Sequence, residues 1–595
     1  DGEEIRATLT HGLDFAHGKG RAIVTADFYN RKATPQSARW FSANGDNVSR
    51  APAPWNVYTS TTFNGLTATS QYGQFALGSV TGTTAYGRPV FTPARPAGIP
   101  ATYALANGTF FLLPITSANV AFGTVAPTRS ATGPGHDYYW NLGDSRLIQP
   151  QSTRGSMFIS GEYDLNPRIT AFTDLSVYQA RSISYRDPDV YTQSSDQDMV
   201  VPVTNPYNPF GNRFWSPTGA PNTDGTPRLT GTPTAVNIVS HRFADFGIRK
   251  DVVTDSVYRG VVGLRGKVFD TWTWEAALLD SFTRGIEYEP AARISLLQAA
   301  LNLSDPATAI NPFERTFAVQ NGAVVDTGKF ANSAKVQASV YAPYIRNGIT
   351  KLSSGDFRAS GDVWPLWGGN KIGGAFGGEI RYEAYDDFRP PYVGLNPANS
   401  GFDPSRTDFV SASSQPDTHG NRHVVSAYAE TVIPLVGHEF RLPLVQLLEF
   451  SGAARFESYS RFGASTKPKY GVNWKPVSWI MVRGSYNRGF RAPSLVSMFK
   501  GSYSGITLSS TDSYRSTVTQ LLTDGPSNRN NLTTGNHNLE PETSTGKSGG
   551  IVIDVPHVKG LSLSFDYWEI RQKSVIAASG TVADDTAALL AATQA

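Results

Sequence analysis

Apolar and polar residues alternate along much of the chain with a period of two, the pattern of β-strands that have one apolar face. In the first run Ile5, Ala7 and Leu9 alternate with polar residues, and a second run over 22–28 follows the turn at Gly18-Lys19-Gly20. Two such runs joined by a short turn predict a β-hairpin, and seven hairpins are predicted in all. The other six pair 158–163 with 169–178, 258–264 with 272–278, 357–363 with 372–385, 424–432 with 448–459, 470–474 with 480–487, and 551–555 with 561–567.

Long polar stretches separate these hairpins, at 33–152, 181–255, 285–355, 386–423 and 491–543. Short turns at one side and long loops at the other are typical of outer-membrane barrels. The chain offers almost no helical pattern that could cover the apolar faces, so lipid is the simpler partner for them. The pattern therefore predicts an all-β protein, a transmembrane antiparallel β-barrel with roughly 14 strands in this segment and long extracellular loops.

Two smaller features refine this prediction. Six tryptophans fall within a few residues of a predicted short turn, where they could form a belt at one membrane interface or simply pack at hairpin ends. One helix is predicted over 291–303, where Leu296, Leu297, Ala300 and Leu301 have helical spacing; we expect it to pack within a loop and to carry no chemistry. The six tryptophans are Trp272, Trp274, Trp364, Trp367, Trp474 and Trp479.

Composition supports a chain of many strands and loops. The 595 residues include 56 Gly, 38 Pro, 26 Tyr and 32 Phe, and only 17% are charged. There is no cysteine, which excludes disulfides, thiolate metal sites and cysteine nucleophiles. The net charge of +3 comes without any basic run, so nucleic acid is not an expected partner. No stretch approaches the roughly 18 apolar residues of a transmembrane helix, and the first four residues do not read as a signal peptide.

Two linked segments in the last third of the chain resemble a known family. Arg-Gly-Ser-Tyr-Asn-Arg-Gly-Phe-Arg-Ala-Pro-Ser-Leu at 483–495 and Asn-Leu-Glu-Pro-Glu-Thr-Ser at 538–544 are similar to a strand end and the next strand start in TonB-dependent outer-membrane receptors. More loosely, 205–211 and 311–313 resemble loop segments of large members. The motif residues expected to shape the barrel rim are Gly489, Phe490, Arg491, Ala492, Pro493, Asn538, Leu539, Pro541 and Glu542.

Each motif residue has a physical role to fill. Gly489 and Pro493 would let a strand end and bend, and Arg491 could anchor the loop through charge-assisted hydrogen bonds to a carboxylate such as Glu542. An architectural role of this kind is favoured over direct contact with a ligand.

The resemblance implies more than the strand pattern does. Family barrels have 22 strands, an N-terminal plug and a TonB-contacting box, so 1–595 is interpreted as one incomplete barrel domain without the plug and the C-terminal strands, with 583–595 as part of an interrupted loop. Implied partners are outer-membrane lipids, the TonB–ExbB–ExbD complex acting through the plug, a nutrient ligand and a surface lipoprotein. The implied location is the outer membrane of a Gram-negative bacterium.

Candidate metal sites are few. His419 and His423 could bind a metal from a polar loop, although solvated histidines are favoured. Two acidic pairs, Asp196 with Asp198 and Asp386 with Asp387, could offer oxygens to calcium, although surface acids are favoured. Neither a metal, a cofactor nor an enzymatic activity is therefore predicted. The glycines between 368 and 378 lack the ending of a phosphate loop and are expected to thin a strand beside a bulge or the plug.

Capture of a ligand is the function that suits the long loops. Aromatic side chains could stack on sugars or aromatic ligands and arginines could hold anionic groups, but each aromatic could equally pack its own loop. Trp40, Trp55, Tyr138, Tyr139 and Arg406 are further candidates of this kind. The residues predicted to contact ligand are Trp140, Tyr207, Phe210, Arg213, Trp215, Arg389 and Tyr392.

The function predicted from the sequence is a receptor that binds a scarce nutrient and imports it with energy from TonB. A siderophore, cobalamin, an oligosaccharide or a peptide would all be compatible. Two alternatives remain open, a passive porin-type channel and a soluble extracellular carbohydrate-binding β protein.

Overall fold

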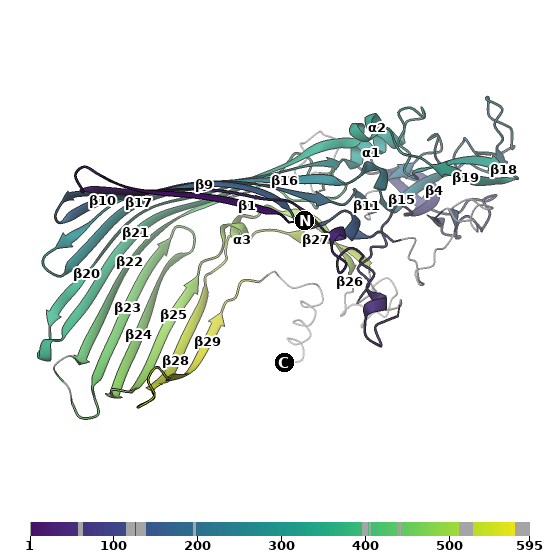
Figure 1. Ribbon diagram of the computed structural model, residues 1–595. Coiled ribbons are helices and arrows are strands. Elements are labelled where there is room, and N and C mark those ends of the chain that lie inside the picture. Colours follow the sequence, from purple (N-terminus) through teal and green to yellow (C-terminus); the bar gives the residue numbers. More distant parts are fainter. Residues whose placement is uncertain are drawn as a thin grey trace.

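Fourteen antiparallel strands form one curved sheet in the computed structural model, which describes residues 2–57, 63–114, 125–126, 139–193, 198–394, 403, 406–437, 440, 442–510 and 527–577 (Figure 1). The order across the sheet follows the order along the chain. Its strands are β1 (Glu4–Phe15), β2 (Gly20–Arg31), β9 (Gln151–Asn166), β10 (Ile169–Arg186), β16 (Arg249–Val268), β17 (Trp272–Ala292), β20 (Tyr341–Pro365), β21 (Lys371–Phe388), β22 (Thr418–Val436), β23 (Leu447–Tyr459), β24 (Gly463–Val477), β25 (Ile480–Arg491), β28 (Glu542–Asp554) and β29 (Ser562–Lys573).

All seven predicted hairpins are present, and each pairs the two runs expected. Leu9 faces Ala26 in the first hairpin and Ile551 faces Phe565 in the last, so apolar residues meet apolar residues across the strands. The prediction of fourteen strands is confirmed. Figure 1 shows the sheet curved like part of a barrel wall, with β1 and β29 at its two edges.

The two faces of the sheet differ in chemistry. On the outer face, large apolar side chains such as Leu278 and Ile380 are 64% and 65% exposed. On the inner face, charged side chains from strands two apart meet: Arg455 on β23 lies 3.4 Å from Glu379 on β21. Side chains from strands two apart come closer together on the concave side of a curved sheet than on its convex side. An exposed apolar face of this extent is unstable in water and matches the lipid-facing surface of a membrane barrel.

Tryptophans gather at the short-turn end of the sheet, as expected. Trp364 and Trp367 are 67% and 52% exposed, and the indole N–H groups of Trp367 and Trp474 donate to the carbonyls of Leu435 and Leu444. An exposed ring whose N–H is satisfied suits a membrane interface.

Several strands are longer than the alternation predicted. β20 starts at Tyr341 rather than near 357 and has 25 residues, about 80 Å at the usual rise per residue. A hydrocarbon core is only about 30 Å thick, so these strands continue far beyond it. His419 and His423, predicted in a loop, lie on β22. The alternation is lost beyond the membrane because neither face there has to be apolar.

The long polar stretches build a compact unit at one end of the sheet, which we call the loop module (Figure 1). Its buried core includes Phe75, Phe110, Trp215 and Leu297, contributed by three different stretches. Its strands are β4 (Gln74–Thr83), β5 (Pro89–Pro93), β6 (Thr109–Leu112), β7 (Val125–Ala126), β11 (Val190–Thr192), β12 (Val200–Val201) and β15 (Ala235–Arg242), with the separate pairs β13 (Trp215–Ser216) and β14 (Leu229–Thr230), and β18 (Arg315–Gln320) and β19 (Ala323–Lys329).

Helices are short and belong to the loops. α1 (Ile294–Leu301) confirms the predicted helix and buries Leu297 and Leu301 in the core of the loop module. α2 (Ala334–Val340) and α3 (Leu495–Phe499) were not predicted. Two further pairs, β3 (Thr34–Pro35) with β8 (Leu147–Gln149) and β26 (Tyr503–Ser510) with β27 (Ser527–Thr533), complete the loops. Within the described ranges, no helix has the length and apolar character needed to cross a membrane. Tyr138, Asp196 and 583–595 lie outside the described residues.

Candidate functional site

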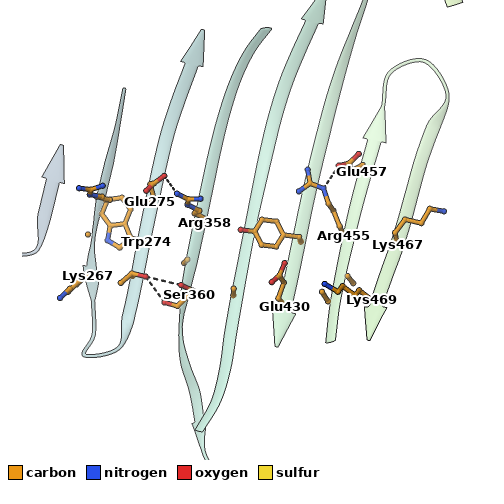
Figure 2. A pocket seen from close by; sticks show the side chains of 18 of the residues that line it. Lys267, Trp274, Glu275, Arg358, Ser360, Glu430, Arg455, Glu457, Lys467 and Lys469 are labelled. Atoms are coloured by element: carbon orange, nitrogen blue, oxygen red, sulfur yellow. Dashed lines mark hydrogen bonds and ion pairs between the residues drawn. The ribbon is translucent and has the colours of Figure 1, made fainter. Parts of the chain in front are cut away.

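A pocket of about 1080 Å³ lies on the inner face of the sheet (Figure 2). Its floor includes the small residue Ala375 and the ring of Tyr428. This ring lies over Gly377, where a Cβ would come within 2.6 Å of it. The predicted thinning by the glycines of β21 is thus seen here, and a register shift opposite Ile372 supplies the bulge. We call this cavity the inner pocket.

Charged side chains dominate the lining of the inner pocket. Eight are cationic and three are acidic. Some are paired across strands: Arg358 donates to Glu275 at 2.7 Å, and Arg265 reaches Glu162 at 2.5 Å. Lys467 and Lys469 make no ion pair among the described residues, and they are alternate residues of β24 (Figure 2). The cationic residues are Arg168, Arg265, Lys267, Arg358, Arg455, Lys467, Lys469 and Arg488, and the acidic ones are Glu275, Glu430 and Glu457.

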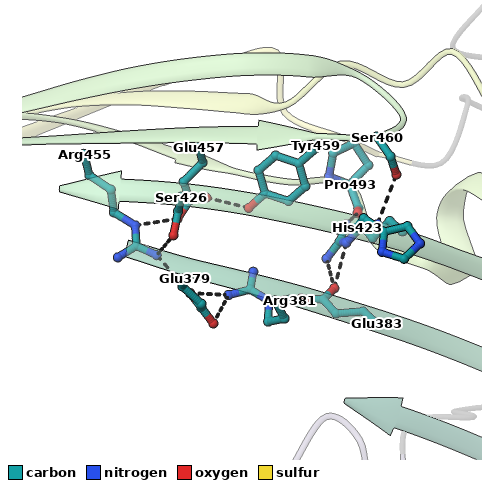
Figure 3. A network of polar contacts seen from close by, with 11 residues as sticks. Glu379, Arg381, Glu383, His423, Ser426, Arg455, Glu457, Tyr459, Ser460 and Pro493 are labelled. Atoms are coloured by element: carbon teal, nitrogen blue, oxygen red, sulfur yellow. Dashed lines mark hydrogen bonds and ion pairs between the residues drawn. The ribbon is translucent and has the colours of Figure 1, made fainter. Parts of the chain in front are cut away.

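From the inner pocket a chain of alternating charges runs along the inner face (Figure 3). Arg455 contacts Glu457 and Glu379, and Arg381 lies between Glu379 and Glu383. Glu383 then pairs with Arg422 at 2.6 Å. Each charge has an opposite neighbour, so this part of the wall is held by a network rather than by isolated pairs.

The network ends at the rim motif that the sequence singled out. Arg422 donates to the carbonyl of Pro493 at 2.7 Å. Arg491 lies directly opposite Glu542 in the β25–β28 register and binds it through two contacts of 3.0 and 3.1 Å, which is the anchor predicted. Phe490 packs edge-on against Tyr459 with ring centroids 5.9 Å apart.

The remaining motif residues mark the limits of the strands. β25 ends at Arg491, and Ala492 and Pro493 lead to α3. Asn538, Leu539 and Pro541 form the turn before β28, which begins at Glu542. The motif is therefore a rim corner, with Phe490 and Ala492 also lining the inner pocket.

Buried carboxylates join the sheet to the loop module, and sequence reasoning missed them. Asp408 is fully buried and accepts from Arg88, Arg293 and Ser295, which come from two other loops. Asp189, also fully buried, lies 3.2 Å from Arg249 at the start of β16. Single aspartates in polar stretches give no signal of such burial.

Two predicted ligand contacts are core residues of the loop module. Phe210 and Trp215 are each 2% exposed, and the Trp215 indole donates to the carbonyl of Pro209 at 2.9 Å. Burial leaves neither ring accessible to a ligand at the surface. Their role is packing, the alternative that the sequence left open.

Tyr207 and Arg213 lie together on the surface of the loop module. Both line a pocket of about 560 Å³ between two loops. The Tyr207 hydroxyl donates to the carbonyl of Pro306 at 2.8 Å, and Arg213 pairs with Asp224 at 2.5 Å. We call this the outer pocket, and two predicted ligand residues share it.

The other three predicted contacts are dispersed. Arg242 lies over the Trp140 ring at 5.1 Å, and Arg293 over Tyr392 at 3.8 Å. Arg389 donates to Asp387 at 2.7 Å and is half-buried beside Arg346. All three side chains take part in contacts within the protein. Among the further candidates, Trp40 and Trp55 are exposed at 74% and 47%.

The proposed metal ligands are not grouped as a metal site would require. Asp386 and Asp387 are neighbours on β21 and point to opposite faces, where Asp386 meets His419 and Asp387 is buried between arginines rather than at the surface. The His423 ring lies beside the Tyr382 ring. His423 is on the same face of β22 as His419, but four residues of strand place the two histidines about 13 Å apart. Asp198 accepts three hydrogen bonds. Among the residues described, no group of three potential ligands could hold a metal.

A buried titratable cluster lies in the loop module. Burial lowers the pKa of His241 to about 3, and both its ring nitrogens lack hydrogen-bond partners. Burial, followed by the nearby Asp245, raises the pKa of Glu314 to about 8. The His241 and Glu314 side chains are 4.0 Å apart. Neutral forms of both groups are therefore favoured near pH 7.

Comparison with known proteins agrees with this architecture. The family model for TonB dependent receptor-like, beta-barrel proteins matches residues 101–593. No curated protein matches the chain. Among solved structures, the chain is similar to a mutant of the ferric enterobactin receptor PfeA from Pseudomonas aeruginosa (13% identity, 96% of this chain, 51% of that chain, TM-score 0.42) and to the siderophore receptor PirA from Acinetobacter baumannii (10%, 96%, 50%, 0.43). The chain spans about half the length of these receptors.

An antiparallel sheet with an apolar outer face, a charged inner face and long loops at one end defines the wall of a transmembrane β-barrel. The chain belongs to the TonB-dependent receptor-like β-barrel family, because the family model covers most of its length. This is a family of outer-membrane transport receptors of Gram-negative bacteria, not of enzymes.

Proposed function

We propose that this chain is the greater part of the barrel of an outer-membrane receptor that binds a scarce nutrient outside the cell and imports it with energy delivered by TonB. The observation that carries the proposal is the family match over 101–593. A siderophore, cobalamin, an oligosaccharide and a peptide are the ligand classes considered. We interpret 1–595 as one incomplete barrel domain, and the TonB–ExbB–ExbD complex and a surface lipoprotein as its partners.

The loop module supports capture from outside. It lies at the end of the sheet opposite the tryptophan-rich short turns and has its own hydrophobic core. A packed core fixes loops in place, so that a binding surface is formed before the ligand arrives. We assign first contact with the nutrient to the outer pocket, where Tyr207 supplies a ring and Arg213 a cation.

Uptake by intact cells tests the proposal. Cells that make the full-length receptor should accumulate the radiolabelled nutrient, and dissipating the proton-motive force should abolish accumulation while leaving binding at the surface intact. Uptake that is unaffected by dissipation would instead support a passive channel.

A double substitution tests the outer pocket. Tyr207→Ala with Arg213→Gln should weaken surface binding about tenfold, from the loss of one stacking and one charged contact of about 1 kcal/mol or less each. Tyr288→Ala with Arg6→Gln is the matched control, because neither side chain lines the outer or the inner pocket and Arg6, like Arg213, pairs with an aspartate. This variant should bind as the wild type does.

A further inference from the structure

The apolar outer face of the sheet is not smooth. A depression of about 910 Å³ crosses β17, β20 and β21, with Gly355 and Gly378 in its floor and Leu278, Phe357 and Ile380 along its sides. We call it the wall groove. In the strand register Gly355 lies directly between Leu278 on β17 and Ile380 on β21. A glycine at this position therefore opens a gap between two large apolar side chains.

The glycines keep the wall groove open. A Cβ added at Gly355 would lie 3.2 Å from Cδ2 of Leu278, and one added at Gly378 would lie 3.3 Å from the backbone oxygen of Ser426. Any larger side chain at Gly355 would thus occupy the groove. Apolar side chains that line an unfilled gap lose dispersion contacts, so a hydrocarbon chain from the membrane is the natural occupant.

The wall groove continues towards the loop module. A second cavity of about 550 Å³ shares Leu278, Gly355 and Ile380 with it and adds Ser353 and Tyr382. The strand from 357 to 351 measures about 20 Å, which is about 15 Å of depth at the usual tilt of barrel strands. One leaflet contributes half of a hydrocarbon core of about 30 Å. The length of the groove therefore fits one acyl chain of the leaflet nearer the loop module.

Two cations lie where the wall groove ends. Lys351 follows Ser353 on the outer face of β20 and lies opposite Phe282 on β17. Arg284, the next outer-face residue of β17, is the diagonal neighbour of Lys351, at about 7–8 Å between backbones. Arg284 donates to the side-chain oxygen of Asn347 at 2.9 Å. In the described part of the chain neither cation makes an ion pair.

Two acidic side chains share this face, and each has a local partner. Asp280 accepts from the hydroxyl of Ser353 at 2.5 Å, and Asp386 lies 3.1 Å from Nδ1 of His419. Both cations thus remain available to a group at the membrane surface. An ammonium and a guanidinium on neighbouring strands suit a phosphate held from two sides, and long basic side chains reach from apolar surface to the lipid headgroups.

We propose that the wall groove binds one acyl chain of a phosphorylated membrane lipid and that Lys351 and Arg284 hold its phosphate. The bound lipid is a partner of the barrel wall and not the imported nutrient, so the proposal does not depend on active import. It sets the level at which the membrane surface meets the strands that continue into the loop module.

Native mass spectrometry of the purified full-length receptor in detergent micelles tests the proposal. The probes are dimyristoylphosphatidate and dimyristoylglycerol, which have the same chains with and without a phosphate. The wild type should retain one phosphatidate and bind it about tenfold more tightly than the diacylglycerol. Lys351→Gln/Arg284→Gln should lose this preference, because only the phosphate contacts are removed.

Changes in the wall groove should affect both probes alike. Gly355→Leu fills the groove and should weaken binding of each lipid about tenfold, through lost burial of the acyl chain. Leu278→Ala/Ile380→Ala removes the two sides instead and should act in the same direction. Both of these side chains are well exposed, so their loss leaves the fold intact, which heat-modifiability on gels verifies.

Matched controls separate the site from general lipid contact. Gly549→Leu adds the same side chain to another exposed strand glycine, on β28, where an added Cβ would meet nothing within 4 Å. Lys19→Gln/Lys559→Gln removes two charges from exposed short turns. Both controls should bind as the wild type does. Equal losses in Gly355→Leu and Gly549→Leu, or no loss in either groove variant, would overturn the groove. Equal binding of the two lipids by the wild type would overturn the phosphate site.

Discussion

Asp408 joins three segments of the loop module at one buried carboxylate. Its oxygens accept from Arg88, Arg293 and Ser295, while its own backbone carbonyl accepts from Ile294 at the start of α1. Replacing Asp408 by Asn removes a buried negative charge from between two largely buried guanidinium groups. We expect a local loss of about 3 kcal/mol, seen as faster hydrogen exchange over 294–301 and around 88.

Asp270→Asn serves as the control, because Asp270 is an exposed residue of the turn between β16 and β17. It should leave exchange unchanged. Unchanged exchange in the Asp408 variant would mean that the carboxylate does not hold the loops together.

Glu314 makes the stability of the loop module depend on pH. Burial raises its pKa to about 8 in the folded protein from the usual 4.5, so the folded form binds a proton that the unfolded form releases between these pH values. Stability is fully present below about 4.5 and is lost as the pH rises through 8. Glu314→Gln removes this dependence, and at pH 9 the variant should be more stable than the wild type by on the order of 4 kcal/mol. Urea-induced unfolding of the loops, followed at pH 5 and pH 9, measures the difference.

His241 acts in the opposite direction. Its pKa is lowered to about 3 from 6.5, so its contribution is present above 6.5 and is lost as the pH falls towards 3. The change in stability between pH 5 and pH 9 therefore includes a contribution from His241. Glu4→Gln, at an exposed residue of β1, keeps both His241 and Glu314 and serves as the control in the same buffers. An identical pH dependence in the Glu314 variant and the wild type would contradict the assignment.

Contacts of single residues could be predicted from the sequence only where the pairing of two strands was also predicted. Arg491 and Glu542 were matched correctly because the motif fixes both ends of two neighbouring strands. Phe210 and Trp215 were not placed correctly, because an aromatic residue in a polar stretch looks the same whether it packs inside a folded loop or faces solvent. Asp408 and Asp189 were missed for the same reason.

At the scale of strands and helices, membrane contact made the hairpins predictable. Lipid on one face and charge on the other impose strict alternation, as in Glu379, Ile380 and Arg381. In the loop module, β15 and the first half of β4 are buried on both faces, so they leave no alternation and could not be predicted. The outer ends of β17 and β20 were missed because they lie beyond the lipid.

The rim corner between β25 and β28 offers a test at this scale. Arg491→Lys keeps the charge but loses the two-point contact with Glu542. We expect a destabilisation of about 1 kcal/mol, seen as a lower temperature for the heat-induced shift on gels. Glu542→Gln should act in the same direction, because the nearly buried Glu542 also accepts from the backbone of Ile576.

Arg571→Lys is a suitable control, since Arg571 is exposed and pairs with Glu569 on its own strand. It should leave the transition unchanged. If the Arg491 and Arg571 variants behave alike, the rim contact has no special role.

At the scale of the whole molecule, the chain combines two parts with different surroundings. The sheet has its apolar side outward and its charges inward, whereas the loop module has an ordinary buried core. Strands that continue beyond the lipid join the two, so the loops are held at one end of the sheet (Figure 1). A receptor that captures its ligand outside and passes it inward requires such a connection.

The central claim is that the outer face of the sheet contacts lipid and the inner face contacts water. Because the chain has no cysteine, single labels can be placed without background. Leu278→Cys and Ile380→Cys report on the outer face, and Thr273→Cys and Ser360→Cys on the inner face.

Spin-label accessibility of these four variants of the full-length receptor in lipid vesicles is the most direct measurement. The outer-face labels should collide readily with dissolved oxygen and poorly with a water-soluble nickel chelate. The inner-face labels should show the opposite preference and collide more readily with the chelate than with oxygen. The same preference at all four positions would contradict a barrel wall and favour a soluble β protein.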